Sequence, residues 1–160
     1  MSVRASHPNT SLSTKRRKRP DRRPPRRGER EWRPWTLAWL GACGLAIANG
    51  IARQAIYEGH LGGLRAHQIS TATLLAVFAL YVWLLQRRCP LQTARTALAI
   101  GATWVVLTLA FEFGFGLYVT GQSWTELLEA YNLANGRVWV LVPLWTLVAP
   151  AVMRTVQRPR

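Results

Sequence analysis

Four long apolar segments constrain the fold of this chain more than any other feature. A helix needs about 20 predominantly apolar residues to cross about 30 Å of hydrocarbon. The second and third segments reach that length, and the shorter first and fourth can do so if Arg53 and Arg137 snorkel to the interface. We therefore predict an all-α protein, a four-helix transmembrane bundle with spans at residues 35–53, 66–86, 96–120 and 137–153.

The fourth segment differs from the others because it contains two prolines, Pro143 and Pro150. Proline damages the interior of a soluble helix, but a membrane helix tolerates it and can be kinked by it. We expect a kinked fourth span.

A strongly basic stretch precedes the first apolar segment. Residues 1–34 contain 12 Lys/Arg and 3 acidic residues, with prolines between the basic runs. This composition predicts a disordered tail. A net charge of +14 would suit a nucleic-acid binder, but most of this charge adjoins a membrane anchor. We expect the partners to be the lipid bilayer and its anionic head groups, with a membrane-protein partner also possible and no specific nucleic acid.

The distribution of basic residues predicts the orientation. Four spans would place 18 Lys/Arg on the side of the tail and only Arg53, Arg65 and Arg137 on the other side. Because cytoplasmic loops carry the excess of Lys/Arg, both termini should be cytoplasmic, including the basic residues 154–160. The expected location is a bacterial inner membrane or its equivalent.

The first apolar segment has two other interpretations. A basic region, an apolar run and Ala46-Ile47-Ala48 could form a secretory signal with a cleavage site. The residues before Cys43 also resemble a bacterial lipoprotein box faintly. Either processing event would remove the first span, so we retain both as alternatives.

Five polar residues of the spans gather toward the outer side of the predicted bundle. Asn49 and Arg53 lie four residues apart and so share a helix face. Glu112 lies about 24 Å from the inner boundary of the third span at the helical rise. The predicted binding cluster is Asn49, Arg53, His67, Glu112 and Arg137.

Glu112 is the residue of this cluster that most needs a partner. A charged carboxylate at membrane depth is costly, so it should be paired, hydrated or protonated. We expect Arg53 or Arg137 to pair with it, with His67 and Asn49 as hydrogen-bond donors. The cluster is then either a ligand-binding or proton-linked site, or a clasp that locks the spans together.

The outer segment between the third and fourth spans contains a capping box, Ser123 and Glu126. It predicts a short helix over residues 124–133, which is a plain connection or a lid. His60 and His67 lack further ligands at a suitable spacing, so we predict no metal and no cofactor.

Several short arrangements resemble those of small multi-span bacterial membrane proteins with no assigned function. These arrangements are Asn49…Arg53, Ala66-His67-Gln68-Ile69-Ser70, Phe111-Glu112-Phe113 and Tyr131-Asn132…Gly136-Arg137-Val138-Trp139. The resemblance covers residues 35–153 and implies no activity and no catalytic residue.

Three functional classes fit the sequence. We expect a non-enzymatic module that handles a small molecule or ion, or an accessory subunit. The alternatives are an intramembrane enzyme that uses Glu112 with His67 or an arginine, and a structural or interaction protein whose tail binds lipid.

Overall fold

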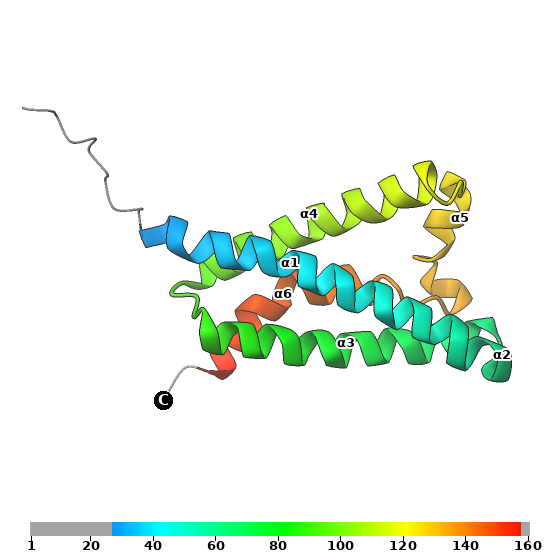
Figure 1. Cartoon of the computed structure of the whole chain (residues 1–160), viewed down its shortest axis with the longest axis horizontal. Coiled ribbons are helices and arrows are strands. Elements are labelled where there is room, and N and C mark those ends of the chain that lie inside the picture. Colours follow the sequence, from blue (N-terminus) through cyan, green and yellow to red (C-terminus); the bar gives the residue numbers. More distant parts are fainter. Residues whose placement is uncertain (1–26, 158–160) are drawn as a thin grey trace, which may run out of the picture.

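The computed structural model describes residues 27–157, and every regular element in that range is helical (Figure 1). The elements are α1 (Arg27–Ala52), the π-helix η1 (Arg53–Tyr57), α2 (Glu58–Leu61), α3 (Gly63–Arg88), α4 (Ala94–Tyr118), α5 (Trp124–Glu129), the 3-10 helix η2 (Leu133–Asn135) and α6 (Leu141–Val156). The all-α prediction is confirmed for this part of the chain.

Between residues 27 and 157, three helical stretches are long and apolar enough to cross a membrane, not four. They are Glu31–Ile56, Gly63–Arg88 and Ala94–Tyr118. These match the first three predicted spans, so the length and composition of the apolar helices are those of membrane-spanning helices.

The fourth predicted span is shorter than expected. α6 has 16 residues, about 24 Å at the helical rise. It begins at Leu141 because turns precede it, with Leu141 N–H donating to the carbonyl of Val138 at 3.1 Å. Pro143 therefore lies in the first helical turn, where a missing N–H costs nothing, and only Pro150 is interior.

The first helix begins earlier than the predicted tail boundary at residue 34. α1 starts at Arg27 and includes Pro34. Tertiary packing explains this extension, because Trp32 packs against the core and Trp35 is completely buried in it. The rest of the predicted disordered tail, residues 1–26, lies outside the described residues, as do residues 158–160.

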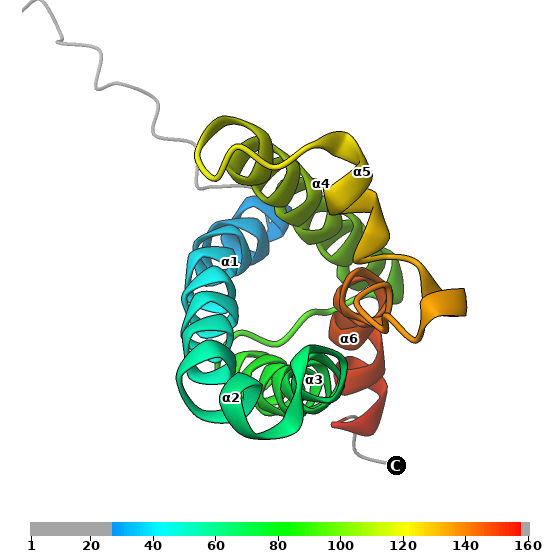
Figure 2. The ribbon, with the colours of Figure 1, turned by 90° about the vertical axis from the view of Figure 1, so that its right-hand side faces the viewer.

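α1, α3, α4 and α6 form a ring when viewed along the bundle (Figure 2). We call the end with the α3–α4 connection, residues 89–93, the loop end, and the end with α2, α5 and η2 the cap end (Figure 1). α1 begins and α6 ends at the loop end. The two ends of the described chain therefore lie on the same side of the bundle.

The hydrophobic core occupies the loop-end part of the bundle. Trp35 donates from its indole N–H to the carbonyl of Cys89 at 3.0 Å, and Trp104 donates to the carbonyl of Trp35 at 3.0 Å. Arg154 is buried and donates to the carbonyls of Leu91 and Gln92. These bonds tie α1 and α6 to the connection between α3 and α4, and they tie α4 to α1.

α4 and α6 approach each other closely at Gly101. A Cβ atom at this position would overlap the backbone carbonyl group of Leu147. Only glycine allows two helix backbones to lie this near each other.

Candidate functional site

A cavity of about 510 Å3 lies toward the cap end of the bundle. Residues of α1, α3, α4, α5 and α6 contribute to its wall. Four of the five residues in the predicted cluster line it: Arg53, His67, Glu112 and Arg137. The fold therefore brings to one cavity residues that are up to 84 positions apart in the sequence.

Asn49, the fifth residue of the predicted cluster, does not line the cavity. Its side-chain amide donates to the hydroxyl of Ser70 at 2.7 Å and to the carbonyl of Ser70 at 3.0 Å. Because these bonds join α1 to α3 beside the cavity, Asn49 fixes the position of the neighbouring wall.

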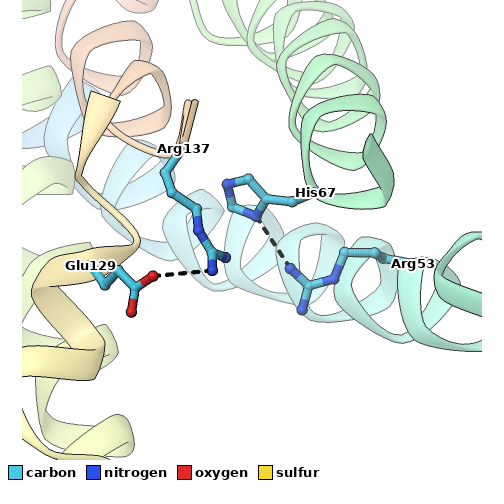
Figure 3. A network of polar contacts seen from close by, with 4 residues as sticks. All are labelled: Arg53, His67, Glu129 and Arg137. Carbon is cyan, nitrogen blue, oxygen red and sulfur yellow. Dashed lines mark hydrogen bonds and ion pairs between the residues drawn. The ribbon is translucent and has the colours of Figure 1, made fainter. Parts of the chain in front are cut away.

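Arg53 and His67 meet at the cap end of α1 and α3 (Figure 3). Nη1 of Arg53 lies 3.4 Å from Nδ1 of His67. A guanidinium has only donors, so Nδ1 accepts and the hydrogen of the neutral ring lies on Nε2. Nε2 is therefore a donor, and it belongs to a side chain that is only 5% exposed.

A local change of helix type accompanies Arg53. The chain passes from α1 into the π-helix η1 at this residue. Single π-helical turns are rare and occur often at functional sites. The sequence contains no signal that we could have used to predict this turn.

Arg137 lies at the rim of the cavity, across from Arg53 and His67 (Figure 3). Its Nη2 lies 3.4 Å from Oε1 of Glu129, and these side chains are 38% and 52% exposed. Figure 3 shows the side chains of Arg53, His67 and Arg137 directed into the same space from three different elements. Glu129 partly balances the charge of Arg137, whereas Arg53 has no carboxylate within ion-pair distance among the described residues.

The expected pairing of Glu112 with an arginine is wrong. Oε2 of Glu112 accepts a hydrogen bond from the hydroxyl of Tyr131 at 2.6 Å. Within residues 27–157, no hydrogen bond or ion pair joins Glu112 to Arg53, Arg137 or His67. The physical reason is that the segment after α5 reaches back to α4 and supplies a neutral donor.

Tyr131 is suited to this role by its surroundings. Its ring stacks on Phe113, with centroids 6.2 Å apart. Burial raises the pKa of Tyr131, and the hydrogen bond to Glu112 and its negative charge raise it further. The hydroxyl therefore remains a donor over the whole physiological pH range.

Four buried N–H groups in the cavity wall have no hydrogen-bond partner among the described residues. They are Arg53 Nε, His67 Nε2, Trp139 Nε1 and Trp145 Nε1. Trp139 Nε1 lies near Glu112 and Tyr131 but does not reach hydrogen-bond geometry with either. An unsatisfied buried donor costs about 1–3 kcal/mol, so this concentration of donors in one cavity is unusual for a packing feature.

Trp139 and Trp145 were missed as functional candidates in the sequence. Tryptophans near the end of a span suggest interfacial anchors, and nothing in their spacing indicates that both residues line one cavity. The turn before Leu141 places Trp139 in the wall, and the packing of α6 places Trp145 there.

The part of the cavity nearer the loop end is apolar. Its wall includes Trp39, Leu74, Phe78 and Trp104. Trp39 and Trp104 already use their indole N–H groups, in bonds to Thr108 Oγ1 and to the carbonyl of Trp35. The cavity is thus divided into an apolar end and a donor-rich end, whose wall also contains the carboxylates of Glu112, Glu126 and Glu129.

The segment that closes the cap end contains the predicted capping box. Ser123 Oγ accepts from the backbone N–H of Glu126, and the Glu126 carboxylate accepts from the Ser123 backbone N–H at 2.7 Å. The capping box is confirmed, but α5 ends at Glu129 and not at residue 133. The bond from the Ser123 backbone N–H, together with a second bond that the Ser123 hydroxyl donates to the carboxylate at 2.9 Å, lowers the pKa of the Glu126 carboxyl.

Among the residues that the structure describes, no three His, Cys, Asp or Glu side chains cluster as metal ligands do. His60 is exposed on α2 and does not line the cavity with His67.

Comparisons with known proteins give no family for this chain. No family model, no curated protein and no solved structure matches it. The chemistry of the cavity is therefore the basis for any statement about function.

Proposed function

We propose that this chain is an integral protein of a bacterial inner membrane that binds a small organic anion in the cap-end cavity. Large apolar side chains exposed around the bundle support the membrane location, including Leu37, Leu40, Val106 and Leu144. The loop end carries Arg87, Arg88 and Arg95, which supports a cytoplasmic loop end and an outer cap end. In this arrangement α6 serves as a fourth, short span.

Reporter fusions test this topology. Fusions at Gln92 and Arg160 should report the cytoplasm, and a fusion at Gln122 should report the periplasm. A periplasmic signal at Arg160 would remove α6 from the set of spans.

The observation that carries the proposed binding is the set of four buried N–H groups without partners in one cavity wall. Such donors require hydrogen-bond acceptors, and the anionic group of a small organic anion offers several acceptor oxygens. Arg53 adds a positive charge, because its guanidinium has no carboxylate partner in the described part of the chain. The cavity volume of about 510 Å3 lies within the range of small-molecule sites, about 300–1,000 Å3.

Four probes with the same alkyl chain test the charge requirement: hexanoate, hexyl phosphate, hexanol and hexylamine. Titration calorimetry on the purified chain in phosphatidylcholine nanodiscs should detect saturable binding of the two anions only. Arg53→Gln should weaken hexanoate binding by about tenfold or more, because a charge-assisted hydrogen bond contributes about 1.5–3 kcal/mol.

Arg65→Gln is the matched control, since Arg65 is an exposed residue of α3 that does not line the cavity. It should leave hexanoate binding unchanged. Equal binding of hexanol and hexanoate, or equal binding by the Arg53→Gln variant and the unaltered protein, would refute the proposed function.

The basic tail supports a separate contribution to membrane association. Its Lys/Arg residues adjoin the first apolar segment, and each basic residue near an anionic surface contributes about 1 kcal/mol. We propose that the tail binds anionic lipid head groups on the cytoplasmic side.

A further inference from the structure

One wall of the cavity is formed by side chains that are also exposed on the outside of the bundle. Ile47, Phe111 and Phe115 line the cavity, yet they are 52%, 42% and 46% exposed. Side chains that belong both to the cavity surface and to the outer surface of the bundle mark an opening in the cavity wall. This opening lies between α1, which supplies Ile47, and α4, which supplies the two phenylalanines.

The relative positions of α1 and α4 explain the opening. The two helices contact each other toward the loop end, where Trp35 packs on Trp104 with centroids 5.8 Å apart and Trp39 donates to Thr108. From there they diverge toward the cap end (Figures 1 and 2). Cys43, Ala46 and Ile47 continue the cavity wall along the diverging part of α1.

The opening is apolar and lies along the membrane-spanning part of the helices. Ile47 precedes Arg53 by six residues and Cys43 precedes it by ten, which correspond to roughly 9 Å and 15 Å along the helix axis. Polar lining residues such as Gln122 and Glu129 occur instead at the cap end. With α1 and α4 in a bilayer, the opening therefore faces hydrocarbon, and the donor-rich end lies near the head groups.

We propose that the ligand of this cavity is a membrane-resident amphiphile, an alkyl chain with a phosphate or carboxylate head, which enters laterally between α1 and α4. The head accepts from Arg53, His67 Nε2 and Trp145 Nε1. The chain passes through the opening between Ile47 and Phe115 and remains in contact with lipid. This inference rests on the proposed anion binding and adds the class of ligand and its route.

Photoreactive hexadecyl phosphate tests the route, with hexadecanol that carries the same mid-chain diazirine as the uncharged control. Each probe is added to the full chain in phosphatidylcholine nanodiscs, and labelled residues are identified by peptide mass spectrometry. The phosphate probe should label residues 43–47 and 111–115. Excess hexyl phosphate, or the substitution Arg53→Gln, should reduce this labelling by about tenfold or more, whereas Arg65→Gln should not.

The alcohol should label lipid-facing residues around the whole bundle, and hexyl phosphate should not compete with it. Equal labelling of the opening by both probes, without competition, would overturn the proposal. If hexyl phosphate binds but hexadecyl phosphate does not label the opening, the lateral route is wrong and the proposed function stands. If hexyl phosphate does not bind, both the proposed anion binding and the lateral route are wrong. If Arg53→Gln does not fold, competition by hexyl phosphate in the unaltered protein still tests the proposal.

Discussion

The bond between Tyr131 and Glu112 gives the strongest prediction about stability. Tyr131→Phe removes one hydroxyl and keeps the ring that stacks on Phe113. Glu112→Leu removes the acceptor and replaces it with a side chain that suits the membrane interior. The two substitutions together form a double-mutant cycle around a single bond of 2.6 Å.

The geometry sets the expected magnitude. An O–H···O distance of 2.6 Å lies within the range of charge-assisted bonds, about 2.5–2.7 Å. Such bonds contribute about 1.5–3 kcal/mol, and removing one partner leaves the other unsatisfied. Tyr131→Phe should therefore lower the free energy of unfolding by about 1.5–3 kcal/mol. The coupling energy of the cycle should have a similar size, because both single variants lose the same bond.

Reversible unfolding in mixed dodecyl maltoside and dodecyl sulfate micelles measures these free energies. Tyr118→Phe provides a matched control, since Tyr118 is 89% exposed near the end of the same helix as Glu112, and it should change little. Strictly additive effects of the two substitutions would show that Glu112 has another partner and would refute the reasoning.

Three further predictions concern the rest of the chain. Gly101→Ala should destabilise the packing of α4 on α6 by about 1–3 kcal/mol because it overpacks a backbone contact, while Gly114→Ala, which meets open space, should have little effect in the same unfolding assay. In the capping box, the pKa of Glu126 is lowered in the folded state, so its contribution to α5 is present above the pKa of the unfolded chain and is lost as the pH falls through the folded pKa. Amide exchange, corrected for its intrinsic pH dependence, should detect this loss in α5, and Glu126→Gln, which removes the titrating group, should abolish the pH dependence; an unchanged pH dependence in that variant would contradict the assignment. A peptide of residues 1–34 should bind phosphatidylglycerol vesicles with an affinity that falls as salt rises, whereas equal binding to phosphatidylcholine vesicles would argue against an electrostatic mechanism.

The long helices could be predicted from the sequence because hydrophobic length is sufficient evidence for them. α3 and α4 begin and end within three residues of their predicted limits. The start of α6 could not be placed as well, because turns before Leu141 and the position of Pro143 shorten it. Hydropathy alone does not distinguish a turn from a helix in an apolar segment.

The cavity was partly predictable from depth along the helices. Arg53, His67, Glu112 and Arg137 lie at similar depths, and polar side chains of spans face the protein interior. The partner of Glu112 was not predictable, because Tyr131 lies in an irregular segment whose path back to α4 depends on tertiary packing. The place of Trp145 in the cavity wall was not predictable either, because it depends on how α6 is rotated about its axis.

The most direct test of anion recognition is the nuclear magnetic resonance spectrum of the indole N–H groups. Trp35 and Trp104 already donate to backbone carbonyls, whereas Trp139 and Trp145 have no partners among the described residues. In 15N-labelled protein, hexyl phosphate should shift the indole proton resonance of Trp145 downfield along a saturation curve and leave those of Trp35 and Trp104 in place. Saturable binding that leaves the resonance of Trp145 unmoved would contradict an anion site in this cavity.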